Sequence, residues 1–324
     1  RLKGLALRAR HIVEGYVAGL HRSPFRGFSI EFAEHREYAP GDDLRYVDWK
    51  VFGRTDKFYL KQFEDETNLV CHLLLDTSES MTYRSDDAAL SKLEYAQCLA
   101  AALGWLVLQQ QDAVGLTTLD EQLRSVVRPA ATPDHWRHLL EALDSAASHG
   151  GSQAKAAAEA NAEAESGTET SAKIGTRVEP EVARSRGRTK LGPLLGELAA
   201  RLTRRGVVIL FSDLFTDVDE LLAGLKHFRY RRHDVVIFHV LDPREIDFAF
   251  DEPLLLRGLE GLADVEVDAR RLREAYVAEF DAYLRQVRTR CRSQSIDYQL
   301  MRTDRPFDVA LSAYLASRRG QVGS

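Results

Sequence analysis

From about residue 68 onward, short apolar runs of strand length alternate with longer segments that have helical periodicity. This alternation predicts βαβ units, in which crossover helices join parallel strands. Each run is almost continuously apolar or β-branched, as expected for strands that helices cover on both faces. We therefore expect an α/β fold with a doubly wound, mostly parallel sheet. Its predicted strands are Leu69–Leu75, Ala113–Leu119, Val207–Phe211, Val235–Leu241 and Ile296–Met301.

The segments around these strands have the 3.6-residue periodicity of helices. Gln122–Val127 is predicted to add an antiparallel strand at the edge of the sheet. The predicted helices are residues 88–111, 133–146, 190–204, 216–228, 268–294 and 306–318.

The first 67 residues differ in character from the rest of the chain. Residues 1–22 have helical periodicity, and residues 23–67 are rich in Gly, Pro, aromatic and charged residues. The composition of residues 23–67 predicts short strands and ordered loops. We interpret residues 1–67 as an N-terminal accessory region and residues 68–324 as the α/β domain.

Residues 147–187 interrupt the alternation. They are rich in Ala, Glu, Ser and Gly, and their only large aliphatic residues are Ile174, Val178 and Val182. Such a segment cannot bury enough apolar surface to form a core. We predict a flexible insertion within the α/β domain, and a linker between two domains is the alternative.

Composition limits the classes of function. The chain has 324 residues, and 44 basic against 49 acidic residues give it a net charge of -5, which argues against bulk nucleic-acid binding. No stretch reaches the roughly 18 apolar residues of a membrane span. Cys71, Cys98 and Cys291 lack metal-ligand spacing and cannot all pair, which is typical of a reducing compartment. We expect a cytoplasmic protein without a membrane span.

The most specific local pattern is the run DTSES, which places Asp76, Ser78 and Ser80 directly after a predicted strand. In open parallel sheets, ligands bind beyond the carboxyl ends of the strands. A second apolar strand ends in Ser212 and Asp213, and the two aspartates would face each other if the strands are neighbours. Two adjacent carboxylates repel unless a cation or a proton intervenes. Carboxylate and hydroxyl oxygens suit a hard cation such as Mg²⁺ or Mn²⁺.

Asp76, Ser78 and Ser80 resemble the metal-ion-dependent adhesion site of von Willebrand factor type A domains. The resemblance implies a later metal-binding aspartate, a position that Asp213 fits. Leu214 stands where many such domains have glycine.

The same resemblance implies a third hydroxyl ligand at the start of a helix. Thr189 fits best, because it follows Gly187 and Arg188 and opens a helical pattern. Thr176 and the pair Thr117 and Thr118 are alternatives.

The resemblance extends over nearly the whole chain, except for residues 147–187. Residues 24–81 resemble the signature of domain-of-unknown-function family fifty-eight. That family implies a von Willebrand type A-like fold without a settled activity, and association with MoxR-type AAA+ ATPases as an adaptor or co-chaperone. The matching pieces are Phe25-Arg26-Gly27, Glu31-Phe32, Arg36, Tyr38, Pro40-Gly41-Asp42-Asp43, Arg45, Asp48-Trp49, Asp76 to Met81, Asp297-Tyr298 and Thr303-Asp304.

Simpler interpretations exist for these patterns. Asp and Ser are favoured helix caps, so the DTSES run could cap a helix. Residues 40–43 could form a turn within a structural ion-pair network. The basic run at residues 226–233 fits the end of a helix better than a nucleic-acid site.

Several enzyme classes lack support, because the sequence contains no P-loop, GxSxG or GxGxxG motif. Our leading hypothesis is a non-enzymatic, divalent-metal-dependent protein-interaction module. Its metal ligands would be Asp76, Ser78, Ser80, Thr189 and Asp213, and a partner carboxylate would complete the shell. A metal-dependent phosphoesterase and a metal-free structural scaffold are the alternatives.

Overall fold

The computed structural model describes residues 31–37, 49–55, 57–64, 69–146, 191–250, 254–256, 265–306 and 311. The chain divides into two compact units. One consists of Arg1–His21 and Val70–Ser324, and the other of Arg22–Leu69.

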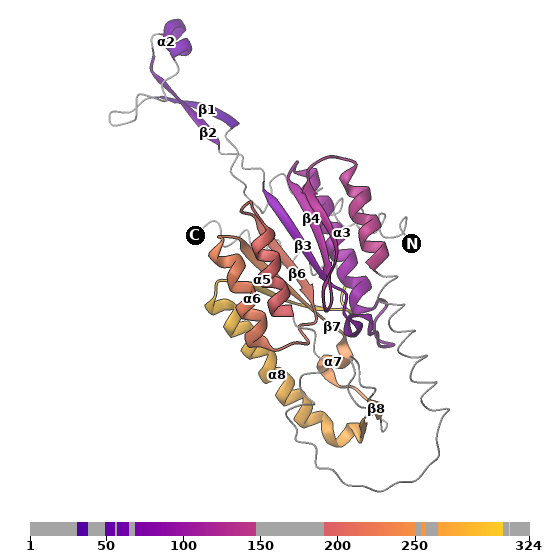
Figure 1. The fold of residues 1–324 in the computed structure, drawn as a ribbon. Coiled ribbons are helices and arrows are strands. Elements are labelled where there is room, and N and C mark those ends of the chain that lie inside the picture. The colour runs from indigo at the N-terminus through magenta and orange to yellow at the C-terminus, as the bar shows by residue number, and fades with distance from the viewer. Residues whose placement is uncertain are drawn as a thin grey trace. The chain divides into compact units, whose positions relative to one another are not determined.

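The larger unit is built on a six-stranded sheet with the order β10-β7-β6-β3-β4-β5 (Figure 1). Neighbouring strands are parallel, except that β5 pairs antiparallel with β4. The predicted α/β fold with a mostly parallel sheet is confirmed, and so is the antiparallel edge strand. The strands are β3 (Val70–Asp76), β4 (Ala113–Leu119), β5 (Leu123–Ala130), β6 (Val207–Ser212), β7 (Asp234–Leu241) and β10 (Asp297–Arg302).

The strand order reverses between β3 and β6. From β3 the chain proceeds outward through β4 and β5, and from β6 it proceeds outward in the other direction through β7 and β10. This is the 3-2-1-4-5-6 order of doubly wound sheets, whose ligands bind at the reversal point, beyond the carboxyl ends of the strands. In the β3–β6 register Leu75 pairs with Phe211, so Asp76 and Ser212 end neighbouring strands.

Helices cover both faces of the sheet (Figure 1). On one face Leu74, Val208 and Ile237 join a buried cluster with side chains of α5, α6 and α8. On the other face Leu73 lies against α3. A Cβ built at Gly104 of α3 would be 3.6 Å from the Leu73 side chain. The main helices are α3 (Lys92–Gln109), α5 (Leu191–Arg201), α6 (Val218–Tyr230) and α8 (Ala269–Ser293), and residues 135–146 are also helical.

Capping residues fix where two of these helices begin. Ser91 and Glu94 form a capping box at the start of α3, and Asp217 caps α6. The N-cap residue lies just before the first residue of its helix. Both helices therefore begin a few residues after the predicted starts at 88 and 216.

Two glycines allow α5 and α6 to approach closely. A Cβ at Gly192 would lie 2.2 Å from the carbonyl oxygen of Glu220, and one at Gly224 would lie 2.3 Å from the carbonyl oxygen of Gly192. Only a residue without a side chain fits at such contacts.

The smaller unit contains an antiparallel pair, β1 (Glu31–Glu37) and β2 (Tyr59–Glu64), and the helix α2 (Trp49–Thr55). The short strands predicted for this region are confirmed. Phe52 and Phe58 stack with ring centroids 4.4 Å apart.

Four short elements complete the description: η2 (Glu79–Thr82), α7 (Pro243–Asp247) and the antiparallel pair β8 (Leu254–Leu256) and β9 (Val265–Val267). The predicted helix at 1–22, the insertion at 147–187 and nearly all of the helix at 306–318 lie outside the described residues. No described helix is both long enough and apolar enough to cross a membrane.

Candidate functional site

Asp76 ends β3 at the reversal point of the sheet, and its side chain is buried. One carboxylate oxygen accepts a hydrogen bond of 2.9 Å from the Ser78 backbone N–H. The other accepts a hydrogen bond of 2.6 Å from the hydroxyl of Ser212, the last residue of β6. The carboxylate therefore ties together the ends of the two central strands.

The hydroxyls of Ser78 and Ser80 lie 3.2 Å apart, and both side chains are buried. The Ser80 side chain also helps to lower the pKa of Asp213. Ser78 occupies the N-cap position of the short helix η2, but its side chain makes no capping hydrogen bond. Its hydroxyl is thus directed to the other site residues rather than to a helix end.

Lys92 is the main site residue that the sequence analysis missed. It is the first residue of α3, and only 1% of its side chain is exposed. Its ammonium donates hydrogen bonds to Asp213, at 2.8 Å, and to Glu245 of α7, at 2.6 Å. The structure thus places a buried cation beside one of the two predicted metal-binding aspartates.

The two aspartates differ electrostatically. Burial and the neighbouring Asp213 raise the pKa of Asp76 to about 6. Burial alone would raise the pKa of Asp213 too, but the Lys92 ammonium more than offsets this and holds it below its usual value. No cation pairs with Asp76 among the residues that the structure describes. Asp76 therefore carries the uncompensated negative charge of the site.

The loop after β6 contains a residue with an unusual backbone conformation. Leu214 has a φ of 53°, in the left-handed region that favours glycine, and its side chain is fully buried. The Tyr283 hydroxyl donates to the Leu214 carbonyl oxygen at 2.9 Å. Leu214 thus adopts a backbone conformation that usually favours glycine, and its buried side chain and the Tyr283 hydrogen bond hold it there.

His239 supports the same loop from β7. Burial lowers its pKa to about 4, so the imidazole is neutral. Its Nε2 lies 2.8 Å from the carbonyl oxygen of Asp213, which can only accept, so Nε2 carries the proton. Its Nδ1, 2.7 Å from the Tyr298 hydroxyl, then accepts from that group.

A cavity of about 230 Å³ lies on the Lys92 side of Asp213. Tyr276, Phe280 and Tyr283 of α8 form part of its wall, and the largely exposed Phe215 lies at its edge. The site therefore has an aromatic wall next to its charged groups.

The structure brings together four of the five predicted site residues: Asp76, Ser78, Ser80 and Asp213. Thr189 lies outside the described residues. Among the alternatives for the third hydroxyl, the Thr118 hydroxyl accepts a hydrogen bond from the Ser125 N–H within the β4–β5 pair.

In the described part of the chain, no group of three or more His, Cys, Asp or Glu side chains could hold a metal ion. A metal at this site would depend on serine hydroxyls and on water or a partner for its remaining ligands. Oxygen-only sets of this kind suit Mg²⁺ or Mn²⁺ rather than softer metals.

The fold and site define a doubly wound α/β protein with a buried carboxylate–hydroxyl cluster at the reversal point of its sheet. Residues 34–285 match the family described as "Protein of unknown function DUF58", and the chain belongs to this family.

The chain is 24% identical over 320 residues to the uncharacterized protein Mb1516 of Mycobacterium bovis, covering 98% of this chain and 89% of that protein. It is similar to the structure of an aerotolerance-related membrane protein from Bacteroides fragilis, with a TM-score of 0.41 and 12% identity, covering 78% of this chain and 99% of that one. It is also similar to the conserved hypothetical protein BatB from Bacteroides thetaiotaomicron, with a TM-score of 0.38, 13% identity and the same coverage.

Proposed function

We propose that this protein is a divalent-metal-dependent protein-interaction module. Asp76, Ser78, Ser80 and Asp213, together with Thr189, would hold Mg²⁺ or Mn²⁺ directly or through water. A carboxylate of the partner would take an open position on the metal. The single observation that carries the proposal is the buried Asp76 carboxylate, which has a raised pKa and no cationic partner among the described residues.

The donor geometry supports this proposal. Adjacent oxygens of an octahedral Mg²⁺ shell lie about 3.0 Å apart, because each metal–oxygen bond is about 2.1 Å. The Ser78 and Ser80 hydroxyls, 3.2 Å apart, have nearly this separation. A bound cation would supply the positive charge that Asp76 lacks and a docking point for an incoming carboxylate.

The partner that we propose is a MoxR-type AAA+ ATPase, with this protein acting as an adaptor or co-chaperone. This part rests on the family resemblance alone, because a fold does not determine a function. No described residue identifies the ATPase as the partner.

One observation favours a second candidate, a metal-free structural scaffold. Lys92 already supplies a buried cation to Asp213 and Glu245. In that case the Ser212 and Ser78 hydrogen bonds to Asp76 would serve only to join the ends of β3 and β6.

Metal binding distinguishes the two candidates directly. We would titrate Mn²⁺ into the protein and follow the loss of the free-ion signal by electron paramagnetic resonance. Wild type should bind one ion and Asp76→Asn should bind none. Asp234→Asn, at the opposite end of the sheet, is the matched control and should bind as wild type does. Equal binding by wild type and Asp76→Asn, or none by either, would overturn the metal site.

Partner binding is tested separately with a purified MoxR-type ATPase from the same genome. Wild type should capture it in Mg²⁺ and lose it in chelator, while Asp76→Asn should fail in both. Capture by both proteins in both buffers would exclude metal-bridged docking. Circular dichroism must first show that the variants fold as wild type does.

A further inference from the structure

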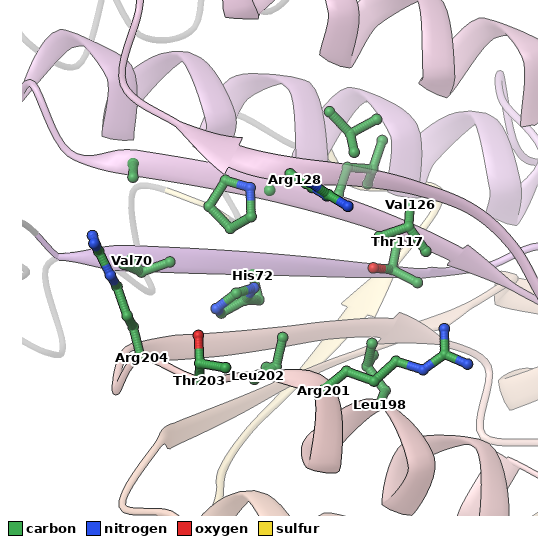
Figure 2. A pocket seen from close by; sticks show the side chains of 15 residues that line it. Val70, His72, Thr117, Val126, Arg128, Leu198, Arg201, Leu202, Thr203 and Arg204 are labelled. Carbon is green, nitrogen blue, oxygen red and sulfur yellow. The ribbon is translucent and has the colours of Figure 1, made fainter.

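A groove of about 860 Å³ lies at the amino-terminal half of the central strands, away from the carboxyl-end site. Its floor comes from β3 and β4, one side from β5, and the other side from the end of α5 and the residues after it (Figure 2). Val70, Ala113, Leu198 and Leu202 give it apolar lining. Its volume is in the range of pockets that hold small organic molecules.

Three arginines line this groove from its two sides. Arg201 and Arg204 come from the α5 side and Arg128 from β5 (Figure 2). Arg201 is paired with Glu197 of its own helix. Across the described ranges, no acidic side chain pairs with Arg128 or Arg204. The groove therefore has an excess of positive charge although the whole chain is acidic.

His72 gives a second, independent indication of a ligand. It lies in the floor of the groove, with an exposed fraction of 8% (Figure 2). Its Nε2 is buried and has no hydrogen-bond partner. Burial and the nearby His233 lower its pKa to about 4, so the ring is neutral and offers one hydrogen bond rather than a charge. A buried polar atom without a partner is costly unless a ligand or water satisfies it.

We propose that this groove binds a small organic anion, with an apolar body on the floor and an acidic group at one of the arginines. Arg128 and Arg204 lie at separate places along the groove (Figure 2). Either could pair with the acidic group, because guanidinium groups bind phosphate and carboxylate through paired hydrogen bonds. The Nε2 of His72 and the hydroxyl of Thr203, which also lines the groove, would hydrogen-bond polar atoms of the ligand. This site is separate from the proposed metal site and does not depend on it.

The test uses two fluorescent probes that share nearly the same aromatic body. Anilinonaphthalene sulfonate carries a negative charge, and N-phenylnaphthylamine does not. Wild type should bind the charged probe at one site. The Arg128→Gln, Arg204→Gln double variant should bind it about tenfold more weakly, because the charge-assisted contact to the acidic group is lost whichever arginine makes it. The double variant should bind the uncharged probe nearly as wild type does.

The matched control is Arg273→Gln, Arg285→Gln, which removes two exposed arginines of α8. It should bind the charged probe as wild type does. Equal affinity of wild type and the groove variant for the charged probe would overturn the proposal. So would equal weakening by the two double variants, or no saturable binding by wild type.

Two further measurements locate the site and identify the acidic group. In ¹⁵N-labelled protein, the charged probe should shift the His72 ring signals and leave those of His239 unchanged, and the reverse pattern would overturn the location. Phenyl phosphate and phenylacetate are then added as competitors. Displacement by one of them shows which acidic group the arginines prefer, and displacement by neither would overturn the proposed pairing.

Discussion

Replacing Lys92 with methionine tests the electrostatic account of the carboxyl-end site. Methionine has a similar length and an apolar end, so the change removes the charge and largely keeps the volume. With N–O at 2.8 Å and an effective dielectric constant of about 20, the attraction of Lys92 to Asp213 alone is about 6 kcal/mol. Desolvation of the ammonium offsets part of this attraction. The pair with Glu245 adds less, because 27% of the Glu245 side chain is exposed.

Removal of one partner of a buried pair typically costs about 3–5 kcal/mol, because the other charge stays buried without compensation. We expect Lys92→Met to lower the free energy of unfolding by this amount near neutral pH. The cost should shrink as the pH falls. In wild type the lowered pKa of Asp213 stabilises the folded state at pH values above the unfolded-state pKa. In the variant Lys92 no longer lowers the pKa of Asp213, and burial raises it. At acidic pH the protonation of Asp213 then removes the uncompensated buried charge.

The measurement is urea unfolding followed by circular dichroism at about pH 8 and about pH 5. Lys226→Met, on the exposed surface of α6, is the control and should change stability by less than about 0.5 kcal/mol. A loss below about 1 kcal/mol for Lys92→Met at pH 8 would refute the reasoning, since a buried carboxylate cannot lose its cation so cheaply. A loss that does not depend on pH would refute the assignment of the cost to Asp213.

Three further changes probe the same end of the sheet and the helices that cover it. Asp76→Asn should stabilise the metal-free protein by about 1–3 kcal/mol above pH 6, because the raised pKa of Asp76 costs stability there. This cost should decline as the pH falls from about 6 toward the usual Asp pKa of 3.8, and urea unfolding at two pH values measures it. Ser212→Ala should destabilise by about 1–3 kcal/mol, since Asp76 loses a buried donor, and a gain in thermal stability would contradict this. Gly192→Ala should cost about 3 kcal/mol or more, because its Cβ would overlap the Glu220 carbonyl. The control Gly196→Ala should be tolerated, because its Cβ would lie 3.3 Å from the His227 side chain. Equal melting temperatures of the two variants would show that α5 and α6 can separate.

The central strands could be predicted because burial on both faces gives continuous apolar runs. The carboxyl-terminal part of β5 was harder to predict. The strand reaches Ala130, three residues beyond its predicted end, and includes Arg128 and Pro129. Proline is tolerated there because β5 is an edge strand, and the outer edge needs no backbone donor. Helix starts depend on single cap contacts, such as that of Ser91, which periodicity does not reveal.

The site was predictable only in part, because strand ends can be found from the sequence but the packing of a helix cannot. Asp76 and Asp213 follow apolar strands, and parallel strands bring such positions to one edge. Lys92 starts a helix, where a lysine is usually exposed, and it lies 121 residues from Asp213 in the sequence. Its burial depends on how α3 packs against the sheet. The signal that could have found it is the position of a basic residue at the start of the helix that follows the DTSES loop.

The strand order also determines when the carboxyl-end site can first exist during synthesis. β3 lies at the centre of the sheet, but its neighbour β6 is made much later, and the bond from Ser212 to Asp76 spans 136 residues. At about 5–20 residues per second, a ribosome needs roughly 7–27 seconds to make the chain between them. During that interval β3 can pair with β4 but not with β6. The nascent chain therefore exposes an apolar strand edge until the second half of the sheet is complete, and this interval is when it is most exposed to aggregation.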